Sequence, residues 1–306
     1  MYRKLQLWLK PLLALSLIMT LVGCSFKTTY RFMDWIVPWY VDDYVTLNDM
    51  QERLLDDELA ELLAWHQSQE LTRYADDLAL FRQQVVSQQW DAEQWLAQLE
   101  RMRGHQQRLL AEAIPRLAKL IRSLSDEQIE EVFANLTEQV AESREKSSQR
   151  SDEEWQQHWY DNNESSLEKW LDQLTDEQQQ MLLQWSKQRP YDRQLITQQG
   201  DFWMTRLRQL FEARAEPSLE ADLTSLLLAK DTVAGFDRYV EQVRWSYASL
   251  YAQMQASMTA EQKSHIDKAL AKWQNDFSDL AERYQAKETN HGSTDAGLAG
   301  HQAASR

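Results

Sequence analysis

His66 and Glu70 have the residue types and the spacing to do chemistry, because they stand four positions apart in a stretch with helical periodicity. On one helix face, such a pair could act in acid–base catalysis or bind a metal. Trp65 precedes the histidine, and Arg73 follows Glu70 by three residues. A metal site needs at least three ligands, and no second histidine stands near His66 in the sequence. We therefore interpret His66 as a half-buried residue that fixes a helix–helix contact through a hydrogen bond.

A second group with ligand-like spacing consists of Glu154, His158 and Asp161. The stronger metal motif, His-Glu-x-x-His on a helix, is absent. Acidic doublets such as Asp76-Asp77 point about 100° apart on a helix, which is typical of solvated faces. No nucleophile elbow and no phosphate-binding loop is present either. We expect no enzymatic activity, no metal and no cofactor, and we keep a cell-wall hydrolase only as a third alternative.

Aromatic residues crowd into one short segment, which contains Tyr30, Phe32, Trp35, Trp39, Tyr40 and Tyr44. The segment could form a membrane-interface belt or a partner-binding surface, since Trp and Tyr suit apolar sites with a wet edge. Core packing explains most helical aromatic stripes, so we favour a core helix packed under the bundle. The candidate binding residues are Trp35, Trp39, Tyr40, Asp43, Tyr44, Trp65, His66, Glu70 and Arg73.

The helices that must position these residues begin with one recurring sequence pattern. At four places an apolar residue precedes Asn, Ser or Thr, and Gln follows three positions later, which is a capping box. The boxes are Asn48–Gln51, Ser125–Gln128, Thr175–Gln178 and Thr259–Gln262, with Asp91–Gln94 as a fifth, weaker case. Their intervals are unequal, so we interpret them as reused helix-start chemistry rather than as a repeat array.

Helical periodicity continues from these starts along most of the chain. We expect links or bends at Pro115, Pro190 and Pro217. The predicted helices cover about 35–45, 49–67, 70–87, 92 to beyond 121, stretches from 126, 152, 176 and 191, a short one after 217, and 231–257 and 260–285.

The N-terminus indicates a bacterial lipoprotein leader. Basic residues precede an apolar run from Leu12 to Val22, which is too short to span a membrane and is typical of a signal peptide. The run ends in Gly23-Cys24, which resembles a lipobox, so cleavage would leave a lipid such as palmitate on Cys24. Ser25 follows, and by resemblance to Gram-negative sorting rules this implies the periplasmic face of the outer membrane. The partners would be the membrane, through the anchor, and a protein of the envelope or periplasm.

The amino-acid composition argues against several fold classes and against one class of partner. The 306 residues contain 13 Trp but only 7 Gly, 5 Pro and 1 Cys, and the formal net charge is −15. Scarce glycine disfavours nucleotide-binding α/β folds and β-sandwiches, while abundant Gln, Glu, Leu and Ala favour helix. The acidic balance argues against nucleic acid as a partner. If Cys24 carries lipid, no thiol remains for a disulfide.

Residues 39–45 read Trp-Tyr-Val-Asp-Asp-Tyr-Val, and Leu63-Ala64-Trp65-His66 and Glu70 to Tyr74 follow. After a lipobox, this pattern resembles an uncharacterised family of bacterial lipoproteins, a domain of unknown function. The resemblance implies localisation and helical architecture but no activity. The Leu-Thr-x-x-Gln helix starts also resemble the sequence signature of small periplasmic stress chaperones. Those chaperones are cradle-shaped and much shorter than this chain.

We predict an all-α bundle of about eight to ten helices, arranged as antiparallel helical hairpins after a cleaved lipoprotein signal peptide. The organisation would be a leader over 1–23, a helical periplasmic domain over 24–286 with a possible sub-boundary near 189–191, and a disordered tail over 287–306. The expected function is that of a non-catalytic protein-binding or scaffold lipoprotein. The alternative is a periplasmic chaperone-like holdase.

Overall fold

A computed structural model describes residues 26–228 and 231–303, with side chains described through Gln285. These residues contain no strand, which confirms the all-α class. In chain order the elements are α2 (Phe26–Tyr30), α3 (Met33–Val41), α4 (Asp49–Trp65), a π-helical turn (His66–Glu70), α5 (Leu71–Ser87), α6 (Ala92–Ser123), α7 (Asp126–Ser148), α8 (Asp152–Leu171), α9 (Asp176–Gln188), α10 (Arg193–Glu212), α11 (Leu219–Leu227), α12 (Phe236–Ala256) and α13 (Ala260–Ala303).

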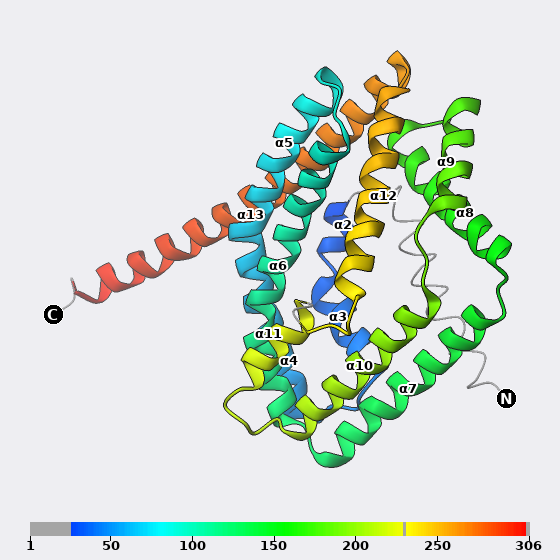
Figure 1. Ribbon diagram of the computed structural model, residues 1–306. Helices are drawn as coiled ribbons and strands as arrows, with labels where there is room; N and C mark the ends of the chain where they lie inside the picture. Colours follow the sequence, from blue (N-terminus) through cyan, green and yellow to red (C-terminus); the bar gives the residue numbers. More distant parts are fainter. Residues whose placement is uncertain (1–25, 229–230, 304–306) are drawn as a thin grey trace, which may run out of the picture.

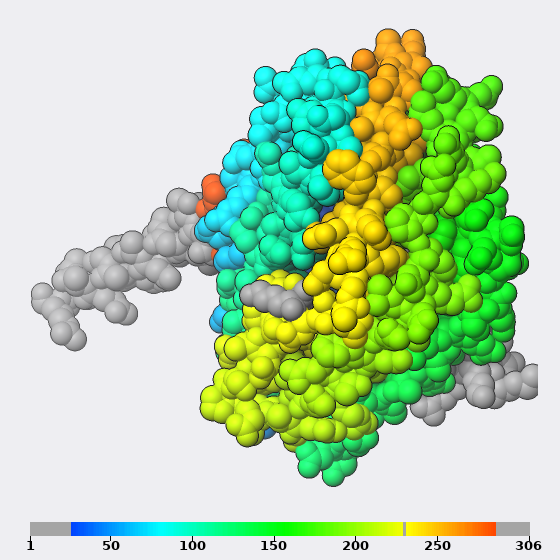
Figure 2. Space-filling model, viewed as in Figure 1, coloured from blue at the N-terminus to red at the C-terminus, as the bar shows by residue number. Residues whose placement is uncertain are grey.

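The long helices double back on one another and form a bundle, as predicted (Figure 1). Helix α5 packs against α13, and α6 packs against both α12 and α4. Figure 2 shows α12 lying between α6 on one side and α9 on the other. The chain thereby brings helices from its first third against helices from its last quarter.

Two large apolar cores hold the bundle together. One core joins α6, α7, α10 and α11, with Ile114, Phe133, Leu210 and Leu223 at its centre. The other joins α5, α8, α9, α12 and α13, with side chains such as Leu182, Leu250 and Leu270. The link between α9 and α10 contains the predicted sub-boundary at 189–191.

Capping boxes begin the helices where the sequence places them. The boxes at Asn48, Asp91, Ser125 and Thr175 each show both reciprocal hydrogen bonds. Thr259 and Gln262 make the same pair of bonds at the start of α13. Ser151 with Glu154 is a further box that the sequence analysis left out.

The structure corrects one expectation about a helix break. We expected α4 and α5 to be separate, but the π-helical turn joins them, and the Leu71 N–H donates to the His66 carbonyl five residues earlier. Such turns insert one extra residue without ending a helix. Helix α6 continues through Pro115, as the predicted helix from 92 to beyond 121 does, and Pro190 and Pro217 lie in links, as expected.

The predicted leader and Cys24 lie outside the described residues, so both stay predictions. The backbone of 287–303 belongs to α13 without described side chains, and the tail over 287–306 also stays a prediction. Within the described residues, no helix is both long enough and apolar enough to cross a membrane.

Candidate functional sites

The α3 part of the aromatic segment lies at the surface, which overturns our expectation of a core helix there, whereas Tyr30 is buried. Phe32, Trp35 and Tyr40 are 55%, 62% and 58% exposed, and no residue of α3 is buried. The Trp35 and Trp39 rings stack with centroids 6.3 Å apart. The error has a physical cause, because α3 packs mainly against α4 and too few neighbours surround this nine-residue helix to cover it.

The end of α3 is fixed to the bundle through Tyr44. Its hydroxyl donates to Gln139 on α7 at 3.0 Å and lies 3.1 Å from the Tyr40 hydroxyl. The Asn135 amide donates to the Tyr44 carbonyl at 2.9 Å. Burial raises the pKa of Tyr44 to about 12, so its hydroxyl stays protonated and able to donate. The half-exposed Asp43 stands beside it in the same turn.

His66 bonds to two tyrosines rather than to Glu70. Its Nδ1 lies 2.9 Å from the Tyr30 hydroxyl of α2, and its Nε2 lies 3.3 Å from the Tyr74 hydroxyl of α5. Burial lowers the pKa of His66, against the opposing effect of the Glu70 charge, so the ring is neutral at pH 7. The neighbouring Trp65 ring tilts against it. The predicted role of His66 in fixing a helix contact matches this geometry.

The Glu70 carboxylate is fully buried and turns toward α6. Arg73 Nη1 and Arg108 Nε donate to its Oε1 at 2.6 and 2.8 Å, and Arg108 Nη2 donates to Oε2 at 3.2 Å. His105 Nδ1 also lies 3.2 Å from Oε2. Burial alone would raise the pKa of Glu70, but the hydrogen bonds from Arg108, Arg73 and His105 outweigh it and hold the pKa below its ordinary value.

Asp77, His105 and Arg108 complete this cluster, and the sequence analysis missed all three. His105 bridges Glu70 and Asp77, with its Nε2 against the Asp77 carboxylate. We had interpreted Asp76-Asp77 as a solvated pair, which is right for the exposed Asp76 and wrong for Asp77. The sequence contained one indication that His105 faces the bundle: it follows Met102 by three residues and so continues the apolar stripe of its helix.

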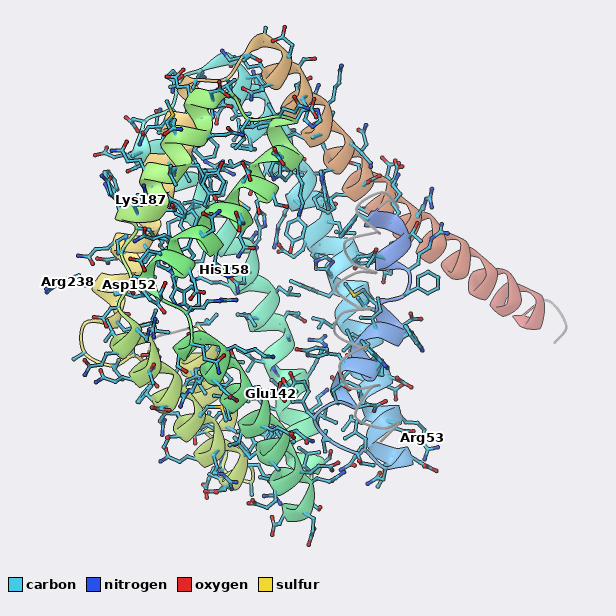
Figure 3. The ribbon with its side chains drawn as sticks, turned by 90° about the vertical axis from the view of Figure 1, so that its right-hand side faces the viewer. Arg53, Glu142, Asp152, His158, Lys187 and Arg238 are labelled. Atoms are coloured by element: carbon cyan, nitrogen blue, oxygen red, sulfur yellow. The ribbon has the colours of Figure 1, made fainter. Side chains whose placement is uncertain are left out.

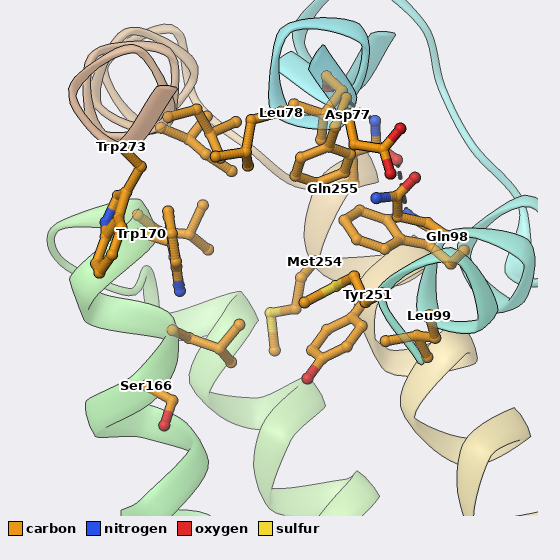
Figure 4. Close-up of a pocket in the computed structure, with 18 of the residues that line it drawn as sticks. Asp77, Leu78, Gln98, Leu99, Ser166, Trp170, Tyr251, Met254, Gln255 and Trp273 are labelled. Atoms are coloured by element: carbon orange, nitrogen blue, oxygen red, sulfur yellow. Dashed lines mark hydrogen bonds between the residues drawn. The ribbon is translucent and has the colours of Figure 1, made fainter. Parts of the chain in front are cut away.

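An apolar pocket of about 530 Å³ opens beside this cluster, between α5, α6, α8, α12 and α13. Figure 4 shows Asp77 and Gln98 on one side of it and Trp170 and Trp273 on the opposite side. Tyr251 and Met254 of α12 lie between them. This pocket could not be predicted from the sequence, because its walls come from five helices far apart in the chain.

The group of Glu154, His158 and Asp161 does not assemble. Glu154 caps the start of α8, Asp161 accepts from Gln157, and His158 contacts Asn162. His158 stands on the face of α8 shown in Figure 3, apart from the labelled Glu142. Across the described residues, no three His, Cys, Asp or Glu side chains come together to hold a metal ion.

Comparison with known proteins gives one match. The model of a family of unknown function, DUF6279, matches residues 43–237. This stretch contains the Glu70 cluster and runs from Asp43 into the first residues of α12, leaving α3 and nearly all of α12 and α13 outside it. Neither the curated proteins nor the solved structures contain a match to the chain.

Proposed function

The chain belongs to the family of unknown function DUF6279, and on that premise we propose that it is a non-catalytic, lipid-anchored binding module of the bacterial envelope. The match confirms the expected membership in an uncharacterised family. Because the function of the family is unknown, the proposal rests on this chain's own surface. Its binding site for a protein partner is the aromatic surface of α3, defined as Phe32, Trp35, Trp39 and Tyr40.

The observation that carries the proposal is the exposure of this aromatic surface. Three of its four side chains are more than half exposed. Exposed aromatic clusters are unusual on soluble proteins and mark interaction sites, where Trp and Tyr supply much of the binding energy. The stacked Trp35 and Trp39 rings form a ready-made apolar contact. Tyr40 adds a hydroxyl at the edge.

The surface is held in place before any partner arrives. Tyr44 and Asn135 tie the end of α3 to α7, and Thr46 donates its backbone N–H and its hydroxyl to Glu131 on the same helix. A preorganised surface loses less conformational entropy on binding than a mobile one. These contacts therefore favour a defined partner over a passive hydrophobic patch.

The proposed anchor sets the location of this surface. Cys24 precedes Trp35 by eleven residues, so a lipid there would keep α3 within a short chain length of the membrane. Several acyl chains give stable anchoring, at about 0.8 kcal/mol per buried CH₂ group. The partner would then be an envelope or periplasmic protein reached from the periplasmic face of the outer membrane.

The charged cluster suits structure better than catalysis. A carboxyl that donates a proton in sugar hydrolysis needs a raised pKa and a free face toward substrate. The Glu70 carboxylate is fully buried, is bound by Arg73 and Arg108, and has a lowered pKa. These properties support a non-catalytic role.

A chaperone-like holdase is the second candidate, because exposed apolar side chains also occur elsewhere. Met50, Met102 and Trp245 lie exposed on α4, α6 and α12. Scattered apolar contacts suit weak binding to many unfolded chains, whereas one preorganised surface suits a single partner.

Co-purification of the full-length tagged protein from solubilised envelopes tests the proposal. We expect one discrete envelope protein, lost when Trp35→Ser and Tyr40→Ser are combined and retained in Trp245→Ser, a control on α12 that is 47% exposed. Equal recovery from both variants would contradict the proposal, and a heterogeneous set of unfolded proteins would favour the holdase. Labelling with a palmitate analogue tests the anchor separately, because the label should disappear in Cys24→Ser.

A further inference from the structure

We propose that the pocket between α5, α6, α8, α12 and α13 binds a hydrophobic organic cation, with an apolar body among the aromatic side chains and an ammonium-type head against Asp77. This site is independent of the aromatic surface of α3.

The dimensions and walls fit a small organic molecule. A volume of about 530 Å³ lies within the range of about 300–1,000 Å³ that ligand sites occupy. Most of the lining side chains are apolar, and the Phe, Tyr and Trp residues among them come from five helices: Tyr74, Phe81, Trp95, Trp170, Tyr251, Trp273 and Phe277. The apolar parts of these walls cannot hydrogen-bond to water, so an apolar ligand that displaces water from them gains free energy.

The charged lining favours a cation over an anion. Asp77 and His105 are the titratable acid and base among the lining residues, and no Lys or Arg of the described chain lines the pocket. Arg73 and Arg108 hydrogen-bond to Glu70 and are not among the lining residues, although Arg108 Nη2 also contacts His105 Nδ1. A fatty acid would therefore bring its carboxylate toward a carboxylate, whereas an ammonium head would meet an opposite charge.

Asp77 is positioned to receive such a head. His105 Nε2 occupies one of its carboxylate oxygens, Oδ2, and no partner for Oδ1 is found within the described part of the chain. The Asp77 side chain is one-third exposed, so a ligand in the pocket can reach it. Aromatic rings attract cations through their negative faces, and Tyr74 and Phe81 belong to the lining on the same helix as Asp77.

Two probes of matched shape and opposite charge test the sign of the site: tetraphenylphosphonium and tetraphenylborate. Equilibrium dialysis would use the full-length protein in a nonionic detergent, with detergent alone subtracted. We expect tetraphenylphosphonium to bind at one site, about tenfold more tightly than tetraphenylborate. Equal binding of the two probes, tighter binding of the borate, or no saturable binding of either would overturn the proposal.

Variants of α5 place the selectivity at Asp77. Asp77→Asn should weaken phosphonium binding about tenfold and remove the preference over the borate. Asp76→Asn, one residue away and exposed, should leave both affinities unchanged. Phosphonium binding that survives Asp77→Asn unchanged would contradict the proposed head position. If Asp77→Asn does not fold, as judged by its helical circular dichroism, Asp77→Glu takes its place. Asp77→Glu should still bind tetraphenylphosphonium more tightly than tetraphenylborate. Equal binding of the two probes by Asp77→Glu would overturn the proposal.

Discussion

Gln178 and Gln262 exchange two side-chain hydrogen bonds, at 2.9 and 2.8 Å, where α9 and α13 begin side by side. Each glutamine side chain also accepts a hydrogen bond from the backbone N–H of its own N-cap residue. Its second amide hydrogen is donated to a backbone carbonyl in the link just before the other helix. Gln51 and Gln128 make the same exchange at the starts of α4 and α7, at 2.9 and 2.7 Å. The capping boxes therefore join pairs of helices as well as starting them.

Removal of one member of the buried glutamine pair should be costly. Gln178→Ala loses the capping bond and leaves the buried Gln262 amide without its partner, so we expect a loss of about 3 kcal/mol in the free energy of unfolding. Gln94→Ala, in an exposed box that pairs with no second box within the described part of the chain, should lose about 1 kcal/mol. Urea denaturation measures both variants. A Gln178→Ala and Gln262→Ala double variant should lose less than the sum of the singles, and strict additivity would contradict the paired arrangement.

Glu70→Gln tests whether the buried charge is structural. The variant keeps the size of the side chain but loses the charge that Arg73 and Arg108 bind. Both arginines are partly exposed and can be rehydrated, so we expect a loss of about 2–3 kcal/mol rather than the larger cost of a sealed ion pair. Glu138→Gln, an exposed residue of α7, serves as the control and should change stability by less than about 0.5 kcal/mol. The interpretation is wrong if the two variants unfold at the same urea concentration.

The lowered pKa of His66 predicts a defined pH dependence of stability. Below pH 6.5, the ordinary pKa of histidine, His66 takes up a proton in the unfolded chain but not in the folded chain. The folded state therefore loses stability as the pH falls from 6.5 to the pKa that His66 has in the folded protein. Glu70 acts in the same sense at lower pH, because the stability that its charge contributes is lost only as the pH falls below 4.5, its ordinary pKa.

Urea midpoints measured between about pH 8 and pH 5 would reveal the His66 contribution. His66→Gln should be less stable at pH 8 and should show a smaller decline below pH 6.5 than the unaltered protein, in which burial also lowers the pKa of His158. His265→Gln, on α13, is the control and should retain that decline. An identical pH profile for His66→Gln and the unaltered protein would contradict a neutral, buried His66.

Trp35→Ser separates the aromatic surface from the core. Since Trp35 is 62% exposed, its loss should change the free energy of unfolding by less than about 0.5 kcal/mol. Trp185→Ala removes a buried ring whose Nε1 donates to the Ser246 carbonyl, and it should lose about 3–5 kcal/mol. Thermal unfolding followed by circular dichroism compares them. A comparable loss for Trp35→Ser would mean that α3 is packed in the core.

Local physics made the helix starts predictable from the sequence. Each capping box uses residues three positions apart, so Thr175 and Gln178 predict the start of α9 independently of every other helix. The apolar periodicity likewise identified the helical class of the chain. The joining of α4 to α5 was not predictable, because a π-helical turn leaves no clear mark in a stretch such as His66–Glu70.

The candidate sites were predicted only in part, because contacts between distant residues decide them. His66, Glu70 and Arg73 were identified from their spacing, but their partners Tyr30, His105 and Arg108 come from α2 and α6. The exposure of Trp35 depends on how many helices pack around α3, and its periodicity is the same in a core and on a surface. The pocket requires five helices at once.

In-cell photo-crosslinking from position 35 tests the proposed binding surface most directly. A photoreactive phenylalanine analogue would replace Trp35 in the full-length protein, with the same substitution at Trp245 as the exposed control on α12. We predict that position 35 captures one discrete envelope protein and that position 245 does not. Capture of nothing at position 35, or the same products from both positions, would contradict the assignment of α3 as a specific binding surface.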